Sequence, residues 1–198
     1  MAMISVALLS ALRSGALAWD KGTAKIEDLR HTRVVLNILD DQIRGALPLF
    51  YNIRTEERLV MLLGFEGTPT TLRFASRSSF NDGPDGIPRW VDVRWTRDPQ
   101  NSSGELIVEE RRILPPDNVP ELTASWHGVV RRADSCSFEF LAPYQPNETA
   151  KWVQEWHSPP QQMLPRAVRM SCTSKGKTMR SLLPLNYADS SVAGLVLR

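Results

Sequence analysis

The chain has 198 residues, of which 42% are hydrophobic and 23% are charged, which are ordinary values for a globular protein with one sizeable core. The formal net charge of +2 is too small to argue for binding to nucleic acid or to an anionic membrane surface. The 14 prolines outnumber the 11 glycines, which indicates many loops and turns in a chain whose bulk is not helical.

The first nineteen residues, MAMISVALLSALRSGALAW, carry one charge, Arg13, and no acid. A secretory signal peptide would need a positive segment before its apolar core, and the chain opens directly on apolar residues. As a helix the segment would reach about 28 Å, close to the thickness of the hydrocarbon core of a bilayer. A buried helix of a soluble domain is the alternative. Residues 1–19 are therefore predicted to be a membrane or filament-core helix, in which small residues would allow close helix packing: Ala7, Ser10, Ala11, Ser14, Gly15 and Ala18.

Residues 20–47 hold no proline before Pro48 and are predicted to continue the helix. Apolar residues form one stripe, and charged residues occupy the other side. The stripe consists of Ile26, Leu29, Leu36, Ile43 and Leu47. One helix of up to about 47 residues, roughly 70 Å long, is expected to anchor the chain in a membrane and to pack onto a domain.

After Pro48 the pattern changes to short strands separated by turns. The stretch RWVDVRWT, residues 89–96, alternates apolar and polar side chains as a half-buried strand does, and residues 105–114 are its expected hairpin partner. Further strands are predicted within residues 58–67, 70–79, 135–144 and 166–174. The predicted fold is α+β: a long N-terminal helix packed on a mainly antiparallel β domain over residues 48–174, followed by a tail, residues 175–198.

Several short motifs contain residue types that catalytic or metal sites use. Gly176-Lys177-Thr178 follows a strand but lacks the first glycine of a phosphate-binding loop. Asp82 and Asp85 lie in a turn-forming stretch without the spacing of a calcium loop. The three histidines are too scattered for zinc. We therefore expect no catalytic site, no metal and no cofactor.

Two adjacent acid pairs, Asp40-Asp41 and Glu109-Glu110, have side chains that point to different faces of their elements. They are expected to be solvated charges.

The two cysteines, Cys136 and Cys172, lie in predicted strands on either side of one loop. If these strands pair antiparallel, the thiols come close, and in an oxidising compartment a disulfide would stabilise the fold by about 3–4 kcal/mol. Two small buried thiols are the alternative.

Most tryptophans are expected to fill the core. Trp152 and Trp156 lie in a loop of prolines and polar residues and are the better candidates for a partner surface.

The order of several stretches resembles the J-type minor pseudopilins of the type II secretion system, members of the type IV pilin-like superfamily. TRVVLNILDDQIRGAL resembles the end of their stalk helix, LLGFEGTPTTLRFAS their first hairpin, and IPRWVDVRWTRD with GELIVEERRIL the next hairpin. The stretch from SFEFLAPY to MSCT resembles their closing segment, including Trp152, Trp156 and the run Leu164, Pro165, Arg166. The opening differs from the family pattern, because the basic leader, the glycine before the cut and Phe-Thr-Leu-x-Glu are not found. No processing or methylation site is therefore carried over.

The resemblance implies a structural subunit near the tip of the periplasmic pseudopilus that primes its assembly and supports protein export across the outer membrane. It implies binding to the I- and K-type minor pseudopilins and to the major pseudopilin, and a single-pass location in the bacterial inner membrane with the bulk of the chain periplasmic. No nucleic acid and no small-molecule substrate are expected. The alternatives are a minor pilin of a type IV pilus and a membrane-tethered periplasmic β-rich binding domain.

Overall fold

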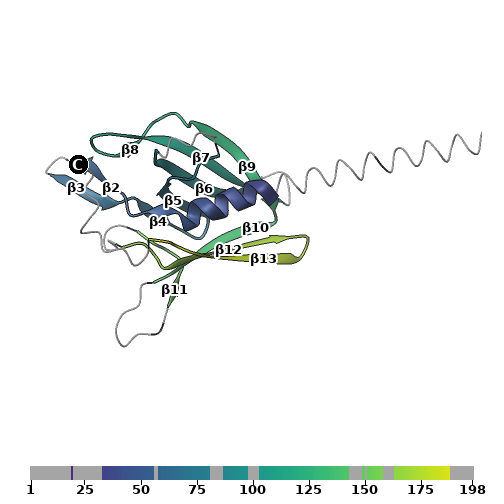
Figure 1. Ribbon diagram of the computed structural model, residues 1–198. Helices are drawn as coiled ribbons and strands as arrows, with labels where there is room; N and C mark the ends of the chain where they lie inside the picture. Colours follow the sequence, from purple (N-terminus) through teal and green to yellow (C-terminus); the bar gives the residue numbers. More distant parts are fainter. Residues whose placement is uncertain are drawn as a thin grey trace, which may run out of the picture. The chain divides into compact units, whose positions relative to one another are not determined.

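The computed structural model (Figure 1) describes residue 19 and residues 33–55, 58–80, 87–97, 103–142, 149, 151–157 and 163–187. Contacts between Cα atoms divide the chain into two units, Met1–Leu36 and Asn37–Arg198. In the first unit, Trp19 and residues 33–36 are helical. The described strands all belong to the second unit.

The predicted fold class is wrong, because the described chain is mostly β with one short helix. Of the described residues, 59% lie in antiparallel strands, whereas the helix covers residues 33–44. Apart from Trp19, the part of the predicted long helix before residue 33, including all six small residues from Ala7 to Ala18, lies outside the described residues. Within the described part of the chain, no helix has the length and apolar character needed to cross a membrane.

The helix also ends earlier than Leu47, the predicted end. The backbone N–H of Gly45 donates to the carbonyl of Asp41 over 2.9 Å and closes the last turn. Glycine is a poor helix former, and the next two residues, Ala46–Leu47, become strand β1, whose partners on β5 are Ser76 and Ala75. Long-range strand pairing therefore takes the residues that a continued helix would have used.

The largest sheet has seven strands in the order β1-β5-β6-β7-β8, with β4 paired to β5 and β9 paired to β7. Its strands, besides β1, are β4 (Phe65–Gly67), β5 (Thr71–Ser76), β6 (Arg89–Arg97), β7 (Gly104–Leu114), β8 (Val119–Pro120) and β9 (Trp126–Ala133). The β6–β7 pairing, with Arg97 opposite Gly104, confirms the predicted hairpin. The strand β9 was not predicted.

The other strands form two smaller sheets. Strands β2 (Phe50–Arg54) and β3 (Leu59–Leu63) make a hairpin, and the four-stranded sheet has the order β11-β10-β12-β13. Its strands are β10 (Ser135–Leu141), β11 (Trp152–Val153), β12 (Ala167–Ser174) and β13 (Lys177–Pro184). Because β13 pairs with β12 along its whole length, the sheet continues past Ser174, where the predicted β domain ends.

The core lies between the large sheet, the four-stranded sheet and the helix. Phe65 of β4 meets Phe140 of β10 edge-to-face, with ring centroids 6.1 Å apart. A Cβ on Gly67 would lie 2.0 Å from the Phe140 ring, so only glycine allows this approach. The helix buries Leu39 and Ile43 completely, and Figure 1 shows it lying across the large sheet.

Candidate functional site

A disulfide joins Cys136 of β10 to Cys172 of β12. The two residues are direct cross-strand partners, with Cα atoms 4.1 Å apart, and both are buried. The structure therefore brings together the two cysteines that lie in predicted strands on either side of one loop. The bond links β10 and β12, the two inner strands of the four-stranded sheet.

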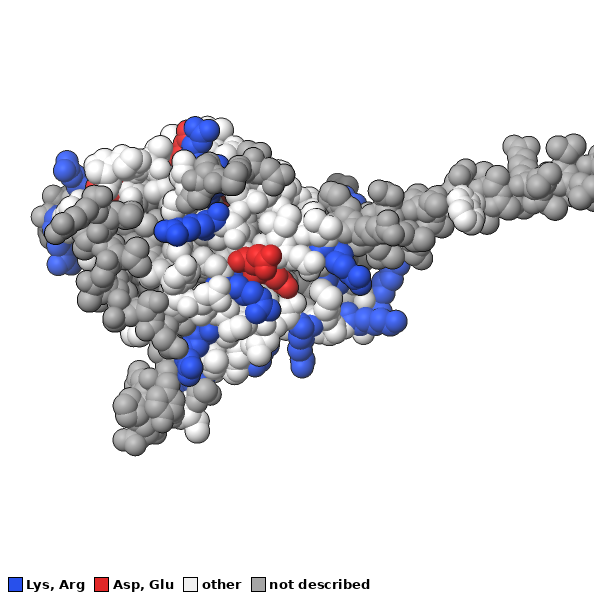
Figure 2. Space-filling model, viewed as in Figure 1, with Lys and Arg blue, Asp and Glu red and all other residues white. Residues whose placement is uncertain are grey.

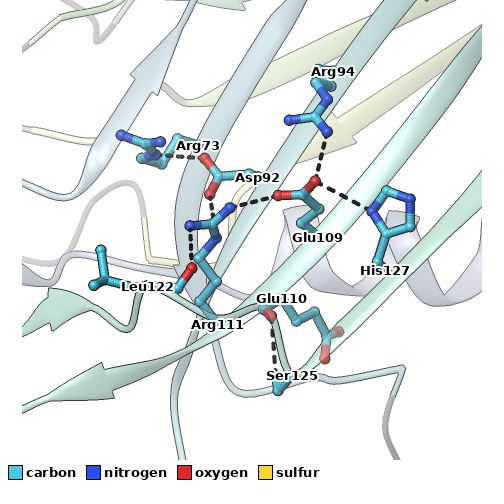
Figure 3. Close-up of polar contacts among 9 residues, drawn as sticks. All are labelled: Arg73, Asp92, Arg94, Glu109, Glu110, Arg111, Leu122, Ser125 and His127. Carbon is cyan, nitrogen blue, oxygen red and sulfur yellow. Dashed lines mark hydrogen bonds and ion pairs between the residues drawn. The ribbon is translucent and has the colours of Figure 1, made fainter.

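One face of the large sheet carries a row of charged side chains that crosses four strands (Figure 3). The row follows the register, because Arg73 pairs with Asp92, Asp92 with Glu109, and Glu109 with His127. Arg73 Nε lies 2.5 Å from Asp92 Oδ1, and His127 Nδ1 lies 3.2 Å from Glu109 Oε1. Each strand thus contributes one charged or titratable group to a continuous row.

Two further arginines complete this charged row around Glu109. Arg94 Nη2 lies 2.6 Å from Glu109 Oε1, and Arg111 Nη2 lies 2.7 Å from Glu109 Oε2. The hydrogen bond from Arg111, with help from Arg94 and His127, lowers the pKa of Glu109 although burial opposes this shift. The carboxylate is held ionised with both oxygens engaged, which suits a structural cross-strand link better than proton transfer.

A groove of about 300 Å³ runs along this charged row. Its lining includes Glu66, Thr71 and His157 besides the ion-paired residues. Because Arg73 and Arg94 remain nearly half exposed, the groove presents charge to solvent and could contact a polar surface of a partner.

The next residue, Glu110, points to the opposite face of β7 and is fully buried. Its carboxylate accepts hydrogen bonds from Gln42 Nε2, at 2.5 Å, from Ser79 Oγ, at 2.5 Å, and from the backbone N–H of Phe80, at 2.7 Å. The expectation of a solvated Glu109-Glu110 pair is therefore wrong for both residues: one lies in an ion-pair row and the other anchors the helix. The alternation of RWVDVRWT and GELIVEERR places Asp92 and Glu109 on one face and Glu110 on the other, but it does not show that the helix covers Glu110.

The structure separates the residues proposed as a partner surface. Trp156 is 1% exposed, forms a bridge with Gly67, and donates from Nε1 to the carbonyl of Met163 over 3.2 Å. Leu164 and Pro165 are buried too. These three residues belong to the core, so only Trp152 and Arg166 stay accessible.

Trp152 lies at the edge of the four-stranded sheet, where the guanidinium of Arg169 sits 3.8 Å from its ring centre. Arg169 also pairs with Glu139, with Nη1 3.0 Å from Oε2. Beside them a groove of about 440 Å³ is lined in part by Ser137, Ser171 and Arg180. The outer face of this sheet is therefore polar and hollowed.

The motif Gly176-Lys177-Thr178 belongs to a hairpin. Lys175 and Gly176 form the two-residue turn between β12 and β13, with positive φ angles of 50° and 72°, as a type I′ hairpin requires. Asp82 and Asp85 lie outside the described residues. Among the described residues, no group of three or more histidines, cysteines and acids is placed to hold a metal ion.

No protein-family model matches the chain, and no curated protein matches it either.

Proposed function

We propose that the chain is a structural subunit, a minor pseudopilin of the type II secretion system that helps to prime assembly of the pseudopilus and so supports protein export. The observation that carries this proposal is the fixed junction between helix and sheet, in which Gln42 of the helix donates to the buried Glu110 of β7. A filament subunit that assembles through a helical segment needs the helical residues of its outer domain to stay attached to the sheet of that domain. A hydrogen bond to a buried carboxylate fixes this attachment better than apolar contacts alone, because its geometry is specific.

The disulfide supports the proposed location. Disulfides persist in oxidising compartments such as the bacterial periplasm, and Cys136–Cys172 is buried in the sheet. We propose that the unit Asn37–Arg198 is periplasmic and belongs to a protein of the inner membrane.

The charged row on the large sheet supports a structural rather than a catalytic role. Glu109 has a lowered pKa and accepts from two arginines, so it is poorly suited to accept a proton at neutral pH. The proposed partners are the I- and K-type minor pseudopilins and the major pseudopilin.

Co-expression of the full chain with the I- and K-type minor pseudopilins of a type II system tests this proposal. The expected result is a stable complex in size-exclusion chromatography that is weakened by Gln42→Leu, which removes the helix–sheet hydrogen bond. Asn37→Leu is the matched control, because it changes an exposed amide of the same helix. If the full chain does not bind these partners but binds minor pilins of a type IV pilus, the protein would be a minor pilin of such a pilus. A chain that binds neither would support the tethered binding domain.

A further inference from the structure

We propose that the free edge of β13 binds an extended, acidic segment of another protein by strand addition. In the part of the chain that the structure describes, β13 is the last strand of the order β11-β10-β12-β13. This inference depends on the sheet alone, and does not require the chain to be a pseudopilin.

The register shows which backbone groups of β13 point away from β12. Ser174 pairs with Lys177 across a two-residue turn, and farther along the hairpin Leu185 N donates to Arg166 O over 3.0 Å. In an antiparallel pair the hydrogen-bonded positions alternate, so the odd-numbered residues of β13 bond to β12. The N–H and C=O groups of the even-numbered residues, Thr178 and Arg180 among them, therefore point outward.

The outward groups are available over the first part of the strand only. At Leu182 the outward carbonyl lies 3.5 Å from Arg44 Nη2, and Pro184 has no N–H to donate. Thr178 and Arg180 thus offer two donors and two acceptors to an added strand, which is the pattern that peptides use when they extend a sheet.

The charge on this edge selects an acidic partner. Lys175, Lys177 and Arg180 are exposed, and none of them forms an ion pair with a described residue, whereas the neighbouring Arg169 is paired with Glu139. Arg131 lies beside the same strand, with Nη1 3.5 Å from Met179 Sδ. Figure 2 shows lysine and arginine side chains gathered over the β12–β13 hairpin. Unpaired basic side chains next to open backbone groups favour acidic side chains on the added strand.

The outer face of the four-stranded sheet also favours an acidic partner. Ser137, Ser171 and Arg180 form one cross-strand row, and all three line the groove of about 440 Å³. An added strand would continue the row with a residue directly opposite Arg180, where a carboxylate could pair with the guanidinium. Leu182, which is 59% exposed, lies two residues farther on the same face and could cover an apolar side chain of the partner.

A second copy of this chain fits the edge less well. Pairing β13 with itself would bring Lys177 and Arg180 of each copy close to the same residues of the other, and like charges across a strand pair are destabilising. Charged edge strands are a common protection against such self-association.

Fluorescence anisotropy with the full chain tests the proposal. The probe is a labelled eight-residue peptide alternating glutamate and valine, and the comparison peptide carries lysine in place of glutamate. We expect saturable binding of the acidic peptide only, weakened about tenfold by Arg180→Gln because one charge-assisted contact is lost. Arg180→Pro also removes an outward N–H and is expected to abolish binding. Arg54→Gln, which removes the same charge from an exposed position at the end of β2, should leave binding unchanged.

Backbone amide exchange provides a measurement that needs no variant. Binding is expected to slow exchange at the outward amides of Thr178 and Arg180, whereas those of Met179 and Ser181 are already bonded to β12. The proposal is overturned if the acidic peptide does not bind, if the lysine peptide binds equally, if Arg54→Gln weakens binding as much as Arg180→Gln, or if the outward amides gain no protection. It is also overturned if the chain alone forms a dimer that Arg180→Pro abolishes, because the edge would then belong to a second copy.

Discussion

Gln42 Nε2 lies 2.5 Å from Glu110 Oε1, and this contact joins the helix to the centre of the large sheet. Both residues are fully buried, and Gln42 Nε2 also donates to the carbonyl of Ser78 over 3.0 Å. A buried carboxylate is tolerated only when donors replace the water it has lost. Gln42, Ser79 and Phe80 supply these donors.

Replacing Gln42 by leucine is therefore expected to destabilise the fold by about 2–3 kcal/mol, because Glu110 loses one of its donors in a buried site. Urea denaturation of the full chain measures the loss. Asn37→Leu, at an exposed position of the same helix, should change the free energy of unfolding little. Equal effects of the two variants would contradict the importance of the buried contact.

Trp152 and Trp156 lie close together in the sequence but have different environments, so replacing each by alanine should cost different amounts of stability. Trp156→Ala is expected to destabilise the fold by about 3–5 kcal/mol, because it empties a fully buried site against Gly67 and removes the indole hydrogen bond. Trp152→Ala loses a partly exposed ring and a contact with Arg169, and should cost about 0.5–1 kcal/mol. Urea midpoints of the two variants, compared with the unchanged chain, test the difference. A larger loss for Trp152→Ala would reverse the assignment of core and surface.

The strands that the sequence predicted are those with a clear alternation. RWVDVRWT and its hairpin partner place Val91, Val93 and Val108 on one face and Asp92, Arg94 and Glu109 on the other, and β6 and β7 form there. The strand β13 escaped prediction because most of its residues are exposed on both faces, as expected of an edge strand. Its local pattern therefore carries no period of two.

The remaining errors come from contacts between residues far apart in the chain. Ala46 and Leu47 continue a helical pattern, but pairing with β5 makes them a strand. Glu110 has the appearance of a surface charge, but it is covered by the helix that carries Gln42. Local sequence could not decide either case, since the competing partner lies about 30 to 70 residues away along the chain.

Stability in acid should depend on Glu109. The pKa of Glu109 is lowered in the folded chain, chiefly by the hydrogen bond from Arg111. The stability that the ionised carboxylate contributes is therefore present above the ordinary pKa of 4.5 and is lost as the pH falls below it. Glu109→Gln should therefore lower stability at pH 7 and flatten its decline below about pH 4.5. Thermal melts across this range measure both effects. A variant whose decline in acid matches that of the unchanged chain would contradict this account.

Asp40 should change the stability of the fold with pH in the opposite direction to Glu109. Burial raises its pKa above 3.8, Arg44 opposes the shift, and Oδ1 has no hydrogen-bond partner among the described residues. The folded chain thus binds the proton of Asp40 more tightly than the unfolded chain does, and stability is lost as the pH rises through the ordinary value towards the raised one. Asp40→Asn is expected to be more stable than the unchanged chain at pH 7, with the difference shrinking towards pH 3. Asp41→Asn, at the exposed neighbour, removes only the smaller repulsion that also raises the pKa of Asp40 and should give a smaller gain. An equal gain would point to charge repulsion instead of burial.

The disulfide between Cys136 and Cys172 should stabilise the fold. Cys136 and Cys172 are separated by 36 positions, and a cross-link that closes a loop of this size lowers the entropy of the unfolded chain enough to contribute about 3–4 kcal/mol. The double variant Cys136→Ala, Cys172→Ala should lose about this much in urea denaturation under oxidising conditions. Reduction with dithiothreitol should destabilise the unchanged chain by a similar amount and leave the variant unaffected. Since the bond joins the strands on which β13 is built, amide exchange in β12 and β13 is expected to accelerate in the double variant more than exchange in β6 and β7. Uniform acceleration across both sheets would show that the bridge stabilises the whole unit rather than the sheet that carries the proposed docking edge.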